Sequence, residues 1–106
     1  MRFLAYDLAL QIIRDLQAPL AIVRRHNAAL AKQGTNAADS VLLNLAEGSG
    51  RDGGDRLHHF RIALGSLREV GAALDIAVAH GWLDGAPLAG ERDRLCGMIY
   101  GLQRRR

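Results

Sequence analysis

Histidine and carboxylate side chains cluster around residue 58, where the sequence could supply metal ligands. His58 and His59 are adjacent, so on a helix their side chains point about 100° apart and cannot bind one metal ion together. Asp55 lies one turn before His59 and is the only second ligand within reach. We therefore predict no metal site, and we assign these histidines to a solvated surface or to an interface.

Glu47 is the next residue that could do chemistry, because it is the only glutamate among the first 68 residues. A general acid or base needs a partner carboxylate or histidine, and the spacing supplies none near Glu47. We expect Glu47 to pair with Arg51, or with an arginine of another helix, and Asn44 to form a hydrogen bond at a helix seam. We therefore predict that the protein has no catalytic residues, needs no cofactor and is not an enzyme.

The glycine-rich segment GSGRDGG, residues 48–54, invites comparison with a phosphate-binding loop. Such a loop follows a strand and ends in Gly-Lys-Ser/Thr, whereas this segment follows a predicted helix and has no lysine. It is better explained as a turn between helices. We predict that Gly48 caps the preceding helix in the left-handed conformation, and that Ser49, Asp52 or Asp55 begins the next helix.

The elements that position these residues are predicted to be four helices, because apolar residues recur at spacings of three and four. The first runs from Phe3 to Gln17, with a stripe at Leu4, Leu8, Ile12 and Leu16, and ends before Pro19. The second helix runs from Leu20 to Glu47, with a kink or break at Gly34–Thr35. The third has its apolar seam from Leu57 to Val78 and ends at Gly81, and the fourth runs from Leu88 to Arg104.

Short connections between these helices predict antiparallel neighbours. The fold class is therefore all-α, an up-and-down antiparallel four-helix bundle with two long central helices, in one domain over residues 1–106. Trp82 and Leu83 should cover one end of the bundle. Glycines inside helices cost roughly 1 kcal/mol relative to alanine, which suggests close helix approach at Gly65, Gly71, Gly97 and Gly101.

The composition excludes several classes of protein. Apolar residues make up 49% and aromatic residues 5% of the chain, a mixture that favours helices over strands. Cys96 is the single cysteine, which excludes an internal disulfide and a multi-cysteine zinc site. No stretch approaches the ~20 apolar residues that span a bilayer, and no signal peptide is recognisable. We expect no membrane partner and a cytoplasmic location.

The formal net charge of +3 and the excess of arginine permit an acidic partner such as RNA without requiring one. Acidic residues interleave with the arginines of the third helix, so an ordinary mixed surface is the alternative interpretation. The candidate nucleic-acid-binding residues are Arg24, Arg25, Arg51, Arg56, Arg61 and Arg68.

A group of residues between Ala37 and Trp82 forms a specific pattern. It consists of Asn44, Glu47, Gly48, Arg51, Phe60, Gly65, Ser66 and Glu69. In this pattern the chain resembles the four-helix bundle protein family related to proteins encoded in intervening sequences of 23S ribosomal RNA genes. The flanking helices match that family only in length and apolar pattern.

The resemblance implies a bundle that assembles into a ring-like homopentamer without an established enzymatic activity. Relatives include accessory proteins of diversity-generating retroelements, which associate with reverse transcriptase and RNA. Many family members carry a basic pair before the serine that matches Ser40, whereas this chain has Thr35 and Asn36 there. The first hypothesis is a homo-oligomer whose basic surface associates with RNA or a nucleic-acid-handling protein. The alternative is a protein-interaction scaffold that binds no nucleic acid.

Overall fold

Five α-helices account for the regular structure of the computed structural model, which describes residues 3–104. No strand occurs within that range, and the prediction of an all-α fold is confirmed. The molecule is elongated, with principal extents of 43 × 22 × 20 Å. The helices are α1 (Leu4–Asp15), α2 (Gln17–His26), α3 (Ala28–Ser49), α4 (Gly53–Ala79) and α5 (Ala89–Arg104).

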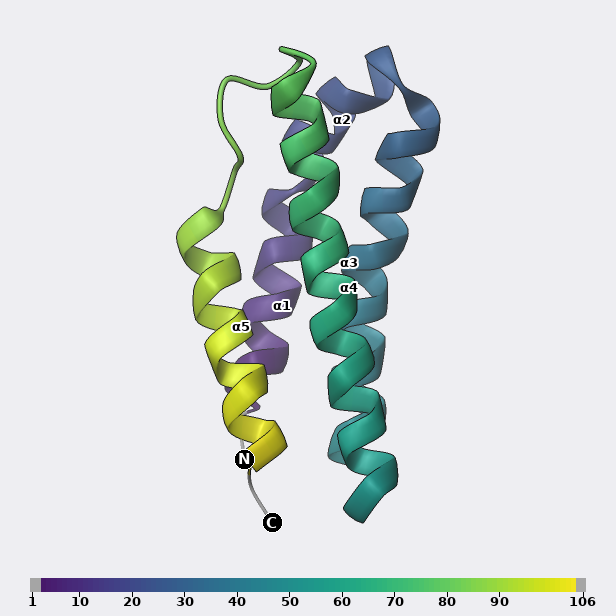
Figure 1. The fold of residues 1–106 in the computed structure, drawn as a ribbon, viewed down its shortest axis with the longest axis vertical. Helices are drawn as coiled ribbons and strands as arrows, with labels where there is room; N and C mark the ends of the chain where they lie inside the picture. The colour runs from purple at the N-terminus through teal and green to yellow at the C-terminus, as the bar shows by residue number, and fades with distance from the viewer. Residues whose placement is uncertain (1–2, 105–106) are drawn as a thin grey trace.

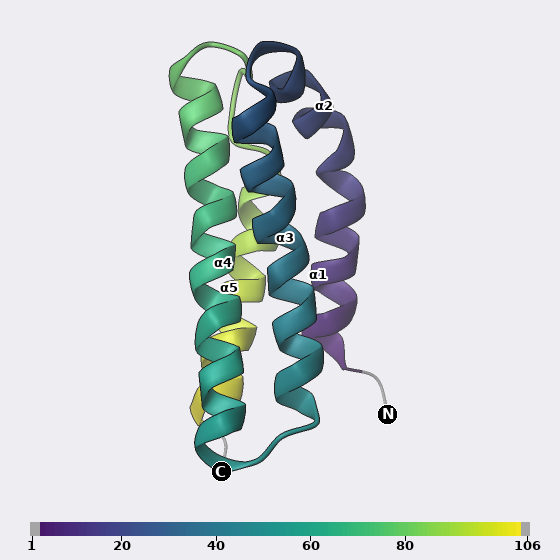
Figure 2. The ribbon, with the colours of Figure 1, turned by 90° about the vertical axis from the view of Figure 1, so that its right-hand side faces the viewer.

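The antiparallel pair of α3 and α4 forms the centre of this arrangement, and these two helices share the most extensive contact. Figure 2 shows α1 beside α3 and α5 behind α4, so that both shorter helices cover the same face of the pair. α1 and α5 also contact each other, and α2 continues beyond α1 to pack on α3 (Figure 1). No helix within residues 3–104 covers the opposite face of the α3–α4 pair (Figure 2).

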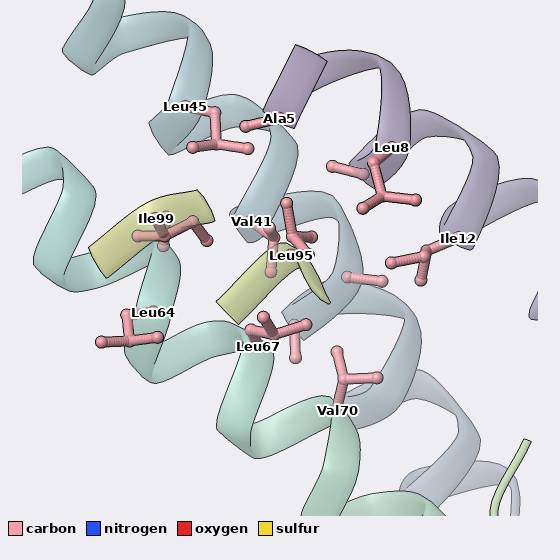
Figure 3. Packing of buried hydrophobic residues seen from close by; sticks show 14 of the residues in the cluster. Ala5, Leu8, Ile12, Val41, Leu45, Leu64, Leu67, Val70, Leu95 and Ile99 are labelled. Carbon is pink, nitrogen blue, oxygen red and sulfur yellow. The ribbon is translucent and has the colours of Figure 1, made fainter. Parts of the chain in front are cut away.

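Apolar side chains from four helices meet between the α3–α4 pair and its cover. Figure 3 shows them interleaved, and they include Ala5, Leu8 and Ile12 of α1, Val41 and Leu45 of α3, Leu64, Leu67 and Val70 of α4, and Leu95 and Ile99 of α5. Most of the predicted stripe of the first helix is therefore confirmed. Leu4 is the exception, because it points outward at the helix start and is 60% exposed.

The prediction of one long helix over residues 20–47 is wrong, because the chain breaks at Asn27. This residue has extended backbone angles (φ −153°, ψ 94°), and its side chain accepts a hydrogen bond from the Leu30 backbone N–H at 3.0 Å. Asparagine is favoured at such an N-cap position, so it begins α3 and does not occupy a buried seam position. The expected break at Gly34 is absent, since Gly34 is buried within α3 against the side chain of Leu20.

Gly48 was predicted to be a left-handed cap, and this is also wrong. It lies inside α3, which ends at Ser49, and the left-handed backbone occurs later, at Gly53 (φ 57°). A Cβ atom at Gly48 would lie 2.5 Å from Cε1 of the buried Phe60. The position requires glycine because the Phe60 ring packs directly on the α3 backbone.

Gly81 ends α4 as predicted, and it does so with a Schellman motif. Its φ is 78°, the Gly81 N–H bonds to the Val78 carbonyl at 2.9 Å, and the Trp82 N–H bonds to the Ala77 carbonyl at 3.0 Å. These are the two hydrogen bonds that define the motif. Trp82 folds back onto Ala77 and, with Leu83, covers a second apolar cluster, as expected for the bundle end.

The expected close approach of helices at the other glycines is largely wrong within a single chain. A Cβ added at Gly65, Gly97 or Gly101 would have no neighbour within 4 Å, whereas one at Gly71 would lie 3.0 Å from a guanidinium nitrogen of Arg92. Gly65 therefore has no structural explanation inside the monomer.

We expect Gly48→Ala to lower the free energy of unfolding by about 1–3 kcal/mol, the usual cost of overpacking a core. The matched control is Gly97→Ala on the exposed face of α5, which should raise stability by roughly 0.5–1 kcal/mol through helix propensity. Urea denaturation followed by far-UV circular dichroism measures both. Equal gains in stability for the two variants would contradict the packing of Phe60 on Gly48.

Asn27→Ala should cost about 1 kcal/mol of stability because the Leu30 N–H loses its side-chain acceptor. Asn27→Ser keeps an acceptor at the same position and should remain within a few tenths of the parent protein. The same denaturation experiment separates the two, and an identical loss in both variants would show that Asn27 does not act as a cap.

Candidate functional site

Polar side chains line the outer edge of the contact between α3 and α4. The hydroxyls of Ser40 and Ser66 lie 2.8 Å apart, and Asn44 Nδ2 donates to the Ser40 carbonyl at 2.9 Å and to its hydroxyl at 3.2 Å. Oδ1 of Asn44 lies 3.0 Å from Nδ1 of His59. All four residues are half-buried. Their hydrogen bonds connect α3 to α4 at two positions along the helix axes, one at Ser40–Ser66 and one at Asn44–His59.

This geometry assigns the proton on His59. A backbone carbonyl can only accept, so the amide nitrogen of Asn44 must face Ser40 and its oxygen must face His59. An amide oxygen also only accepts, so Nδ1 of His59 must carry the hydrogen. The expected hydrogen bond of Asn44 at a helix seam is confirmed, and His59 is its partner.

A chain of charged side chains continues from His59 toward the α3–α4 turn. Nε2 of His59 lies 3.9 Å from Asp55, and Arg51 contacts Asp55 at 3.2 Å and Glu47 at 3.1 Å. The predicted pair of Glu47 and Arg51 is thus confirmed. The hydrogen bond that Arg51 donates to Glu47 and the nearby negative charge of Asp55 raise the pKa of the Arg51 guanidinium above its ordinary value, so Arg51 stays charged.

This arrangement does not form an activated nucleophile. The hydroxyls of Ser40 and Ser66 bond to each other, and His59 bonds to an amide, so neither of these two serines has a histidine as its base. Within residues 3–104 no three His, Cys, Asp or Glu side chains are grouped to hold a metal ion. The Ser40–Ser66 and Asn44–His59 hydrogen bonds each join α3 to α4, and together they hold the register of the two helices.

The residues of the sequence pattern occupy three neighbouring places on this helix pair. Asn44, Glu47, Arg51 and Ser66 belong to the polar network. Gly48 and Phe60 form the tight contact beneath it. Gly65 and Glu69 are exposed on the outer side of α4. Ser40 and His59 were not predicted to belong to the network, although Ser40 lies one turn before Asn44 and therefore on the same face of the helix.

The outer side of α4 carries an exposed stripe in which every residue follows the last by three or four positions. Its members are His58, Ile62, Gly65, Glu69, Ala72, Ile76 and Ala79. Ile62 is 37% and Ile76 is 44% exposed, and Leu43 on the outer side of α3 is 64% exposed. We call the seven α4 residues, from His58 to Ala79, the α4 stripe; Leu43 is not a member. It has one charged member, which is unusual for a solvent-facing helix surface.

The six candidate arginines do not form one surface. Arg24 and Arg25 lie in the last turn of α2 at one end of the molecule, whereas Arg51 and Arg56 lie at or near the α3–α4 turn at the other end (Figure 1). Arg51 is bound by carboxylates, Arg56 donates to the Leu102 carbonyl, and Arg68 donates to the Tyr100 hydroxyl. Among the described residues, the side chains of Arg24, Arg25 and Arg61 have no such partner.

The Ser40–Ser66 hydrogen bond should be measurable in a double-mutant cycle. Ser40→Ala, Ser66→Ala and the double variant should give a coupling energy of about 0.5–1.5 kcal/mol, the net worth of one hydrogen bond. Ser49→Ala is the control, because the exposed Ser49 hydroxyl bonds only within its own helix. Strictly additive losses in urea denaturation would contradict the link between α3 and α4.

Comparisons with known proteins agree with the sequence pattern. None of the described helices is long and apolar enough to cross a membrane. No curated protein and no solved structure is similar enough to the chain to count as a match. The family model described as 23S rRNA-intervening sequence protein matches residues 3–101. The chain therefore belongs to the 23S rRNA-intervening sequence protein family.

Proposed function

We propose that this protein is a non-enzymatic, cytoplasmic homo-oligomer, a ring-like pentamer that associates with RNA or with a nucleic-acid-handling protein. Its subunit is a single up-and-down four-helix bundle domain over residues 1–106, in which α1 and α2 together count as the first helix. The α4 stripe carries this proposal, because it is the largest feature that the monomer leaves unexplained.

The α4 stripe has the composition of a helix–helix contact. Ile62 and Ile76 lie two turns on either side of Glu69, and Gly65 and Ala72 lie between them. Small residues let a second helix approach the backbone closely, and the isoleucines supply apolar area to bury. A neighbouring subunit on this stripe would give Gly65 a close contact, which no described residue of its own chain provides.

A five-membered ring requires two different complementary patches on each subunit. The α4 stripe supplies one of them. We assign the second to the outer face of α3 around Leu43, which is the most exposed large apolar residue among those described. The two patches lie on adjacent helices, so each subunit can contact one neighbour through α4 and the other through α3.

The absence of an enzymatic role is proposed from the chemistry of the polar network. Its histidine is committed to an amide, its hydroxyls to each other and its carboxylates to Arg51. These pairings stabilise the helix pair and leave no base directed at a substrate.

The association with nucleic acid is proposed from candidate arginines that have no hydrogen-bond or ion-pair partner among residues 3–104. Arg24, Arg25 and Arg61 are exposed, and a ring would repeat them in every subunit. Repetition matters because a net charge of +3 gives only a weak field for one small domain. Arg51 supports the proposal less, since two carboxylates already neutralise its charge.

Ile76→Glu should convert the assembly to monomers, because it places a charge in the centre of an apolar contact. The monomer itself should keep its helical content and its stability within about 0.5 kcal/mol, since the side chain is exposed there. Leu43→Glu should have the same effect on assembly. Size-exclusion chromatography with light scattering measures the mass of each variant.

Leu4→Glu is the control, because it introduces the same charge at an exposed leucine outside both patches. It should leave the mass unchanged. An assembly that survives both Ile76→Glu and Leu43→Glu would overturn the assignment of the interface. Salt-insensitive assembly without bound nucleic acid would favour the protein-interaction scaffold over RNA association.

A further inference from the structure

Three aromatic rings stack where the C-terminal ends of α2 and α4 meet. The ring of His26 lies 5.2 Å from that of Trp82, with 4° between the planes, and the ring of His80 lies 4.5 Å from it, with 14° between the planes. Figure 2 shows these helix ends together at one end of the molecule, opposite the α3–α4 turn. The stack thus connects two helices that are far apart in the sequence.

The backbone holds these rings in place. The Schellman motif at Gly81 folds Trp82 back onto the end of α4, where it packs on the cluster that contains Val23 and Ala77. His26 is the last residue of α2, and Asn27 fixes the chain direction directly after it. The stack is therefore built on helix ends and does not depend on a free loop.

Both histidine rings of the stack belong to exposed residues. Trp82 is half-buried, whereas His26 and His80 are exposed. An exposed flat ring at the end of a stack can accept one more flat ring, and an unpaired nucleobase presents such a face. Proteins that bind single-stranded nucleic acid use aromatic rings of this kind next to positive charge.

Arg24 and Arg25 supply that charge. They directly precede His26 in the last turn of α2, and among the described residues neither side chain forms an ion pair or hydrogen bond. Guanidinium groups bind phosphate oxygens with good geometry. In the connection between α4 and α5 the only carboxylate is Asp84, so the charge balance at this end is positive.

We propose that the His26–Trp82–His80 stack, with Arg24 and Arg25, is a binding site for single-stranded RNA. An unpaired base extends the stack on an exposed imidazole, and the two arginines contact the neighbouring phosphates. The proposal rests on the nucleic-acid association proposed above and gives that association a site. Double-stranded RNA fits it poorly, because its bases are already stacked on one another and it offers only phosphates.

Trp82 is the only tryptophan of the chain, so its fluorescence reports directly on the stack. Titration of the intact protein with a short single-stranded oligoadenylate should change the emission of Trp82 in step with binding. The same strand annealed to its complementary oligouridylate should bind more weakly and leave the emission unchanged.

Two pairs of substitutions separate stacking from charge. His26→Ala combined with His80→Ala should weaken binding of the oligoadenylate by about tenfold, whereas His26→Phe with His80→Phe should keep it within about twofold because flat rings remain. Arg24→Gln with Arg25→Gln should reduce the slope of log affinity against log salt by about 1.4. Arg14→Gln with Arg94→Gln removes the same charge from α1 and α5 and should not change that slope.

The outcomes distinguish this site from the broader proposal. If only the Arg24 and Arg25 substitutions weaken binding while the ring substitutions and the Trp82 emission do not respond, RNA association stands and the stacking site is wrong. Equal affinity for single-stranded and double-stranded RNA would also overturn the stacking site. If neither RNA binds, both the stacking site and the RNA association are wrong. The proposed oligomeric state is tested independently, by the mass measurements on the Ile76 and Leu43 variants.

Discussion

The packing of α3 against α4 organises the whole bundle, because every other helix contacts at least one member of this pair. Many of the buried residues of these two helices are small, and they include Ala31, Gly34, Ala37 and Ala38 of α3 and Ala63, Ala73 and Ala77 of α4. Gly48 is the extreme case, because the ring of Phe60 packs on its backbone. Close packing of this kind gains many dispersion contacts. It also creates one continuous apolar face that α1 and α5 can cover together.

The same pair of helices separates the molecule into surfaces with different roles. One face is buried by α1 and α5, and the polar network from Ser66 to Glu47 lies along the outer edge of the helix contact. The outer side of α4 is left to solvent with apolar and small residues. At the far end the Schellman motif of Gly81 places Trp82 against His26. Assembly and RNA binding are therefore proposed for different parts of the surface.

The helices and most of the core could be predicted, because apolar residues recur at spacings of three and four along α1 and α4. The break at Asn27 could not, since Asn27 fits the spacing of a seam as well as it fits a cap. Gly48 and Gly65 are both glycines inside helices, and only the structure distinguishes the one beneath Phe60 from the one without a neighbour. In the candidate site, Glu47 and Arg51 were predictable because they lie one turn apart. Ser40 and Ser66 were not, because their contact depends on the register between two helices.

The native mass of the unmodified protein, measured at several concentrations by native mass spectrometry, tests whether the outer faces of α3 and α4 form an interface between subunits. One chain has a mass of 11.5 kDa. If the outer faces of α3 and α4 are buried between subunits, one species with five times this mass should dominate and should separate only on dilution. A monomer at all concentrations would mean that the α4 stripe faces solvent, and it would contradict the central claim.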